Sequence, residues 1–152
     1  MAAVAAISIS AGAAIAKPKV TQKVKTYALS ATTVPGLLQE MKQRGPNGHW
    51  GYTDWYVQWT GDCRLTVTID ITLPKHKKPA SMPADVRTKF DTMVAALSAH
   101  EQQHGQHAVM AATEIEKAGC KGGDAIIKKY NKVDIDFDRK TNHGAKQGVV
   151  LN

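Results

Sequence analysis

Residues 63–73 read CRLTVTIDITL, and apolar and polar side chains alternate along them without exception. A period of two residues over such a length is typical of a β-strand that buries one face and leaves the other in water. This stretch constrains the fold more strongly than any other, because it requires a sheet with one dry face. The apolar positions are Cys63, Leu65, Val67, Ile69, Ile71 and Leu73.

A second strand precedes this one. Trp55, Val57 and Trp59 share one face, and Thr60-Gly61-Asp62 supplies a turn between the two runs. The pattern therefore predicts an antiparallel hairpin over about residues 53–73.

The residues before the hairpin predict two further elements. Residues 19–29 have the character of an exposed strand of low apolar content. Ser30 to Thr33 supply cap residues for a short helix, with Pro35 in its first turn and Gly45-Pro46 at its end.

The hydrophobic period changes after the hairpin. From Pro83 to about Lys117, apolar residues and histidines advance by threes and fours, which is typical of one stripe of a long helix. We therefore expect an α+β fold, in which a small antiparallel sheet packs on a helix over about residues 83–117. The stripe contains Val86, Phe90, Met93, Leu97, His100, His104, Ala108, Ala111 and Ile115.

The C-terminal part of the chain is less regular. A shorter helix is predicted from Asp124, carrying Ile126, Ile127 and Tyr130. The residues from Asp134 onward are polar and punctuated by glycine, and they are predicted to form a loop.

His100, Glu101 and His104 form an HExxH sequence on the long helix. Histidines four residues apart lie about 6 Å apart along a helix axis. Their rings can therefore converge on one zinc ion, while Glu101 reaches the open side of that ion as a general base for a zinc-activated water. The alternative is a pair of core histidines that hydrogen-bond to the backbone.

The remaining zinc ligand has to come from another part of the chain. His107 lies two turns from His100 and is expected to line the cleft without binding the ion. Glu114 is about 15 Å beyond His104 along the helix. The C-terminal segment offers Asp134, Asp136, Asp138 and His143, and His143 in the Thr-Asn-His-Gly sequence is the favoured ligand over Asp138 or Glu114.

The first sixteen residues and the cysteines point to export. Residues 1–16 carry no charge and end in Ala14-Ile15-Ala16, a pattern that signal peptidases cleave, so the mature chain is expected to be one domain, residues 17–152. Because no Lys or Arg stands near Met1, an alanine-rich tail that is not a signal remains the alternative. We expect a secreted or periplasmic protein without a transmembrane anchor.

Cys63 and Cys120 are an even pair outside any CxxC motif. In an oxidising compartment we expect them to form a disulfide worth about 4 kcal/mol. Two buried free thiols in a cytosolic protein are the alternative.

The chain is basic, with a formal net charge of +7 and a pI near 9.5. Such a charge attracts anionic polymers of the cell envelope. The basic residues are scattered, apart from short runs at 75–78 and 128–129. That distribution is not typical of a nucleic-acid-binding surface.

With these residues in view, the chain resembles a bacterial family of unknown function described as predicted secreted zinc-dependent proteases. The resemblance spans most of the predicted mature chain. It is carried by Tyr27, Arg44-Gly45-Pro46, Tyr52-Thr53-x-Trp55, Trp59, Cys63, Thr72-Leu73-Pro74, His100-Glu101-x-x-His104, Asp138-x-x-Thr141-x-His143-Gly144 and Gln147-Gly148.

The resemblance implies a zincin-like domain that binds one Zn²⁺ through His100 and His104. It makes His143 the natural third ligand and Asp138 a hydrogen-bond partner of that ligand. Phe137 departs from the tyrosine that is common in the family at this position. If a tyrosine hydroxyl polarises the substrate there, Tyr52, Tyr130 or Arg139 must replace it here.

We therefore expect a secreted zinc metallopeptidase that hydrolyses peptide bonds in a peptide or protein substrate. The alternative is a non-catalytic envelope-binding module, in which a metal ion merely fastens the long helix to the C-terminal segment. The sequence specifies neither the substrate nor the oligomeric state.

Overall fold

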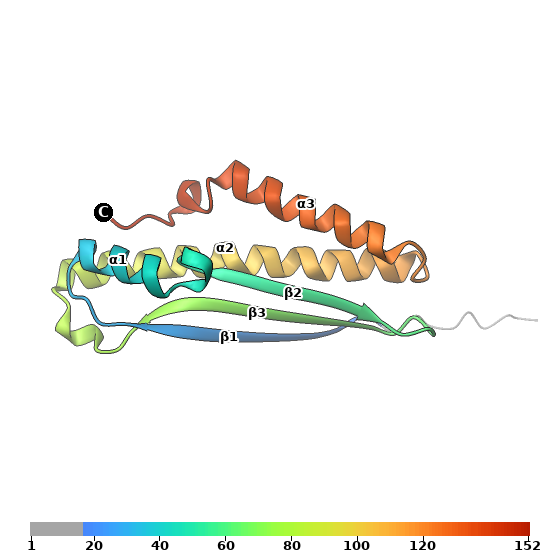
Figure 1. The fold of residues 1–152 in the computed structure, drawn as a ribbon, viewed down its shortest axis with the longest axis horizontal. Coiled ribbons are helices and arrows are strands. Elements are labelled where there is room, and N and C mark those ends of the chain that lie inside the picture. The colour runs from blue at the N-terminus through green and yellow to red at the C-terminus, as the bar shows by residue number, and fades with distance from the viewer. Residues whose placement is uncertain (1–16) are drawn as a thin grey trace, which may run out of the picture.

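The computed structural model describes residues 17–152, which form an α+β fold in three layers (Figure 1). A three-stranded sheet, a long helix and a second long helix are stacked in that order. The predicted signal peptide, residues 1–16, lies outside the described residues. The strands are β1 (Lys19–Leu29), β2 (Tyr52–Trp59) and β3 (Leu65–His76), and the helices are α1 (Val34–Arg44), α2 (Ala84–Lys117) and α3 (Gly123–Thr141).

The predicted hairpin is present. Strands β2 and β3 pair antiparallel, with Trp55 opposite Ile69 and Val57 opposite Val67. The apolar positions of β3 are buried against α2, and Val67 has no exposed surface. The alternation in the sequence thus fixes which face of the sheet is dry.

The sheet is mixed, and the expectation of an antiparallel sheet was wrong for its third strand. β1 pairs in parallel with β3, which lies in the middle of the order β1-β3-β2. α1 follows β1 and precedes β2 in the chain, and it lies near the end of the sheet where β1 and β3 both finish (Figure 1). No tight turn joins β1 to β3, and the local pattern of β1 therefore carries no information about its direction.

α1 begins and ends where its cap residues predict. The Thr33 side chain accepts a hydrogen bond from the Gly36 N–H, and Gly45 ends the helix. Glu40 on this helix accepts hydrogen bonds from the backbone N–H groups of Ser30 and Ala31, at 2.7 and 3.0 Å. Burial alone would raise the pKa of Glu40, but these bonds hold that pKa at about 2.

α2 lies between the sheet and α3, so it is buried on two sides. Met93 and Leu97 belong to the core shared with the sheet. Gly105 also faces the sheet, where a Cβ atom would lie 3.1 Å from the Ile69 side chain. Helix α2 confirms the helix predicted over about residues 83–117.

α3 corrects the prediction of a C-terminal loop, because its regular turns continue through Asp134 to Thr141. The stripe of α3 that faces α2 carries polar as well as apolar side chains. Tyr130, Asp134, Phe137 and Asp138 follow one another at helical spacing. The hydrophobic period is therefore hidden where carboxylates occupy positions that normally carry apolar residues.

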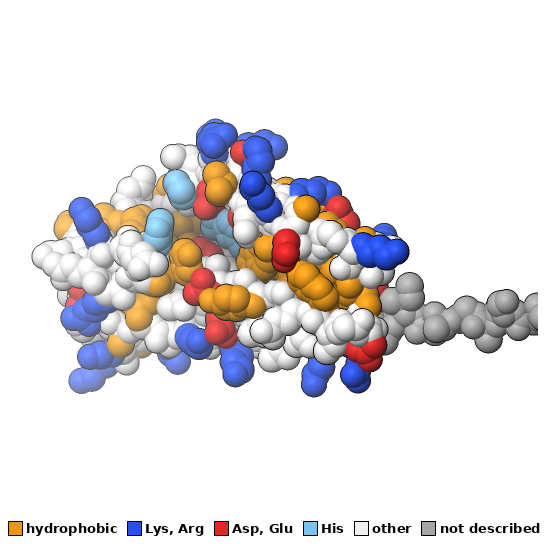
Figure 2. Space-filling view, turned by 45° about the vertical axis from the view of Figure 1, so that its right-hand side comes forward, with side chains coloured by type: hydrophobic (Ala, Val, Ile, Leu, Met, Phe, Trp, Pro, Cys, Tyr) orange, Lys and Arg blue, Asp and Glu red, His pale blue; other side chains and the backbone are white. Residues whose placement is uncertain are grey.

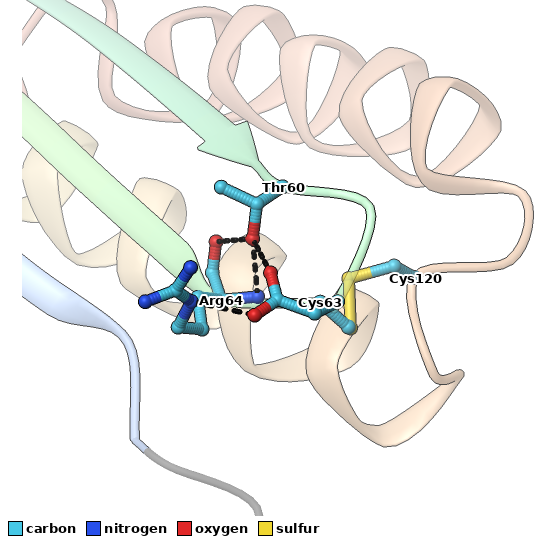
Figure 3. The surroundings of a disulfide bond; sticks show 5 residues. Thr60, Cys63, Arg64 and Cys120 are labelled. Carbon is cyan, nitrogen blue, oxygen red and sulfur yellow. Dashed lines mark hydrogen bonds and ion pairs between the residues drawn. A yellow bond between two sulfur atoms is a disulfide. The ribbon is translucent and has the colours of Figure 1, made fainter.

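The predicted disulfide joins Cys63 to Cys120 with a Cα–Cα distance of 5.6 Å. Figure 3 shows that it ties the β2–β3 turn to the turn between α2 and α3. Thr60 and Arg64 brace the same hairpin turn, where the Arg64 N–H donates to the Thr60 hydroxyl at 3.0 Å. One end of all three layers is thus covalently closed.

No helix within residues 17–152 is long and apolar enough to span a membrane.

Candidate metal centre

α2 and α3 bring two nitrogen atoms and one oxygen atom together where the two helices face each other. Nε2 of His100 and Nε2 of His104 each lie 3.1 Å from Oδ1 of Asp138. Ligand atoms around a tetrahedral zinc ion with bonds of 2.0–2.1 Å lie about 3.3 Å apart. The three atoms therefore have the spacing of a ligand set.

The partners of the other ring nitrogen, Nδ1, show where the proton lies on each of these two imidazoles. Nδ1 of His100 lies 2.8 Å from Oε1 of Gln147, and Nδ1 of His104 lies 2.9 Å from Oδ1 of Asp134. Because both oxygens only accept hydrogen bonds, each Nδ1 carries the ring proton. Both Nε2 atoms then present lone pairs beside the Asp138 carboxylate, and a cation at their centre satisfies all three.

Asp134 is the most heavily hydrogen-bonded carboxylate near this cluster. Its Oδ1 accepts from Nδ1 of His104 and from Nδ1 of His107, the latter at 2.6 Å. Its Oδ2 accepts from Nε1 of Trp55 at 2.7 Å. Burial alone would raise the pKa of Asp134, but these donors lower it below its usual value.

His104 is affected by the same carboxylate. Burial alone would lower the pKa of this buried imidazole. The hydrogen bond to Asp134 and the negative charges of Asp134 and Asp138 outweigh burial and raise that pKa above its usual value.

Glu101 lies on the side of α2 that faces the sheet, one residue from His100. Its side chain is buried, and the Thr53 hydroxyl lies 2.8 Å from Oε2 and 2.9 Å from the Glu101 carbonyl oxygen. Burial raises the pKa of Glu101 above its usual value, although Thr53, His104 and His100 oppose that shift. A carboxylate with a raised pKa accepts protons more readily near neutral pH.

Two glycines allow the backbone to approach these side chains. A Cβ atom on Gly51 would lie 3.0 Å from Oε1 of Glu101. Gly144, with φ +81°, packs against the other side of the cluster, where a Cβ atom would lie 3.1 Å from the His100 ring. Phe137 stacks on that ring, with centroids 4.9 Å apart.

The cluster opens into a pocket of about 390 Å³. Figure 2 shows histidine side chains in a hollow of this face, with acidic side chains close by. Its lining includes His100, Glu101, His104 and Asp138. The pocket therefore exposes the candidate ligands and the neighbouring carboxylate together. Its other lining residues include His49, Trp50, Tyr52, Asn142 and His143.

His143 lies near the cluster but outside it. Its Nδ1 is 3.7 Å from Oδ2 of Asp138, and its side chain is 68% exposed. It belongs to neither group of three ligand atoms within 4.8 Å of one another that residues 17–152 contain. Those groups are His100, His104, Asp138 and His104, His107, Asp134.

The turn that carries His143 has an unusual backbone. Asn142 and His143 have φ angles of +52° and +50°. Left-handed conformations are uncommon for residues other than glycine, and they cluster at functional sites. The His143 N–H donates to the Asp138 carbonyl at 2.8 Å, which holds this turn at the pocket mouth.

The other predicted site residues lie away from the pocket. The Tyr130 hydroxyl donates to Glu114 at 3.1 Å, and Lys129 pairs with the same carboxylate at 2.7 Å. Arg139 is mostly exposed and pairs with Asp136 at 3.3 Å. Arg139 does not line the main pocket. It lines a second, more open pocket together with Asp138 and His143. Of the three proposed replacements for the missing tyrosine, Tyr52 alone lines the main pocket.

Sequence reasoning did not assign roles to Thr53, Gln147, His49 or Trp55 in the site. Thr53 left a usable signal, because it is a polar residue at an inward-facing position of β2, two residues before Trp55. Gln147 had no such signal, since it contacts His100 across 47 residues of sequence.

Comparison with known proteins gives one match. The family described as "Bacterial protein of unknown function (DUF922)" matches residues 24–144, a range that includes HExxH, Asp138 and His143. Neither a curated protein nor a solved structure matches the chain.

Proposed function

The chain belongs to the bacterial family of unknown function DUF922, and on this premise we propose that it is a secreted zinc-dependent metallopeptidase with a zincin-like arrangement. One observation carries the proposal. The ring nitrogens of His100 and His104 and a carboxylate oxygen of Asp138 lie close together, beside the buried carboxylate of Glu101, in the lining of an open pocket.

The spacing and chemistry of this group fit a single zinc ion held by His100, His104 and Asp138. Imidazole nitrogen and carboxylate oxygen are common zinc ligands. Asp138 replaces His143 in this proposal, because its Oδ1 is equally close to both Nε2 atoms. A zinc ion bound there supplies Lewis acidity, which polarises a substrate carbonyl and lowers the pKa of a water molecule.

Glu101 supplies the proton transfers. Its Oε2 is held by Thr53, which orients the carboxylate within the pocket. From this position Glu101 takes a proton from the attacking water and delivers it to the amine that leaves when the peptide bond breaks.

The rim of the pocket offers groups that bind a substrate. Burial raises the pKa of Tyr52 above its ordinary value of 10.0, which is already well above neutral pH, so its phenol can donate a hydrogen bond. Tyr52 and the exposed His143 can both donate hydrogen bonds to the substrate carbonyl oxygen. β2 begins at this rim, and within residues 17–152 it has β3 on one side and no strand on the other. An extended peptide can add to that edge.

Glu101→Gln tests the catalytic role. The variant should retain zinc and lose hydrolysis of an unfolded protein substrate by a factor on the order of 10² to 10⁴. Glu116→Gln, the same change on the same helix, is the control and should keep the parent rate. A Glu101→Gln protein as active as the parent would contradict the proposal.

A non-catalytic role is the second candidate, and the packing of α3 favours it. α3 buries only Gly123 and Tyr130 completely, so an ion between α2 and α3 could serve to fasten α3 in place. The exposed lysines would then contact anionic envelope polymers. Circular dichroism after chelation separates the two roles. A catalytic site leaves the helix content unchanged, and a structural site loses helix with the metal.

A further inference from the structure

Asp134, His104 and His107 form the second group of potential ligands, one turn along α2 from the first. Oδ1 of Asp134 lies 2.9 Å from Nδ1 of His104 and 2.6 Å from Nδ1 of His107. His104 belongs to both groups and faces a carboxylate with each ring nitrogen. The second group is therefore either another metal site or a hydrogen-bonded support for the first.

The number of protons distinguishes these alternatives. A neutral imidazole has one N–H and one lone pair. If Nε2 of His104 binds an ion in the first group, Nδ1 retains the proton and donates it to Asp134. A second ion at Nδ1 would require an imidazolate anion, and the second group therefore suits hydrogen bonds better than a metal.

The neighbouring bonds are consistent with this assignment. The Gln103 side chain amide lies 3.2 Å from Nε2 of His107 and donates to it. His107 therefore also carries its proton on Nδ1, which faces Asp134. Trp55 supplies a third N–H to the same carboxylate. Three donors thus point at the two oxygens of Asp134.

The donors and the carboxylate that accepts from them belong to three different elements. Trp55 lies on β2, His104 and His107 lie on α2, and Asp134 lies on α3. The Asp134 carboxylate therefore fixes the position of the His104 ring relative to β2 and to α3, the elements on either side of α2. This contact lies in the interface between α2 and α3.

We infer that Asp134, with Trp55 and His107, is a positioning residue that holds His104 as the Nδ1–H tautomer with Nε2 directed at Asp138, so that the chain binds one ion. The inference rests on the metal site in the proposed function and is independent of peptidase activity. Hydrogen-bond partners of ligating histidines typically change metal affinity 10- to 100-fold when removed.

The experiment uses the full chain with its disulfide intact and measures zinc stoichiometry and affinity by competition with a chromophoric chelator. The parent should bind one ion. Asp134→Asn should bind zinc 10- to 100-fold more weakly. Asp136→Asn is the matched control, since it makes the same change two residues away on an exposed part of α3, and it should bind like the parent.

Trp55→Phe is a milder second variant, because it keeps a smaller aromatic ring at this position and removes one N–H. It should weaken zinc binding by a smaller factor than Asp134→Asn. Tyr56→Phe, on the opposite face of β2, should not weaken binding. Thermal unfolding of each zinc-free protein shows whether the variants are folded.

Nitrogen NMR of the histidine rings gives a readout that a purely structural role would not change. In the zinc-free parent, at a pH high enough for both rings to be neutral, His104 and His107 should both be Nδ1–H tautomers, and His104 should lose that preference in Asp134→Asn. Two bound ions, or equal affinity in Asp134→Asn and Asp136→Asn, would overturn the inference. A parent that binds one ion tightly but cleaves nothing would contradict only the peptidase proposal, whereas a parent that binds no zinc would overturn both.

Discussion

The two faces of α2 are almost equally buried and chemically opposite. Toward the sheet, α2 packs Met93 and Leu97 against an apolar layer that includes Ile69. Toward α3, it presents His100, His104 and His107, each less than 9% exposed. Burial alone therefore does not separate the part of the helix that stabilises the fold from the part that carries the candidate site.

The difference lies in what burial requires of each layer. Apolar side chains gain about 25 cal/mol for each Å² removed from water, without regard to direction. Buried polar groups must each find a partner. The apolar layer should therefore dominate stability, and the polar layer should dominate metal binding.

Loss of the disulfide should have the largest effect on stability, because it closes both layers at one end. The bond spans 57 residues of sequence. The double variant Cys63→Ser with Cys120→Ser should lower the free energy of unfolding by about 4 kcal/mol, as measured by urea denaturation. Chemical reduction of the parent should give a similar loss. A loss below about 1 kcal/mol would contradict this expectation.

A cavity in the apolar layer should have the next largest effect. Ile69 is 2% exposed and contacts α2 beside Gly105. Ile69→Ala should cost about 3 kcal/mol of unfolding free energy and leave the zinc affinity of the folded protein close to that of the parent. A large loss of zinc affinity would show that the two layers are not separable.

Glu40, which lies outside both layers, should make the free energy of unfolding depend on pH. Its folded pKa of about 2 is below the ordinary value of 4.5, so its stabilisation is present above about pH 4.5 and is lost as the pH falls toward 2. Because solvent screens this carboxylate, Glu40→Gln should cost about 2 kcal/mol at pH 7, less than the full pKa shift implies, and almost nothing near pH 2. Urea midpoints of parent and variant across this range test it, and a difference that did not shrink with acid would contradict the assignment.

Removal of the Asp138 charge should most clearly distinguish the effect on zinc affinity from the effect on stability. Without metal, and at a pH high enough for both imidazoles to be neutral, this carboxylate faces two lone pairs, so Asp138→Asn should change the zinc-free unfolding free energy by less than about 1 kcal/mol. Its zinc affinity should fall by at least as much as that of Asp134→Asn. A strongly destabilised zinc-free variant would instead assign Asp138 a structural role.

His143→Gln should have the smallest effect on zinc affinity, within a factor of about three, because the His143 ring is exposed and lies outside both ligand groups. Competition with the same chelator compares it with Asp138→Asn. A loss that matched Asp138→Asn would restore His143 as the third ligand, which the sequence favoured.

Local patterns predicted much of the fold. The alternation in residues 63–73 identified β3 and its dry face, and the helical stripe identified α2 together with the inward direction of His100 and His104. The extent of α3 was missed because Asp134 and Asp138 occupy the stripe that faces α2, where apolar residues are usual. The parallel direction of β1 was missed because no turn links it to β3.

The sequence by itself determined the HExxH turn, because its geometry depends on a spacing of four residues within one helix. Only the tertiary structure decided which residue completes the cluster. Asp138 meets His100 and His104 across 38 and 34 residues of sequence. Such a contact depends on how α3 crosses α2, and that crossing is set by packing and by the disulfide rather than by any local period.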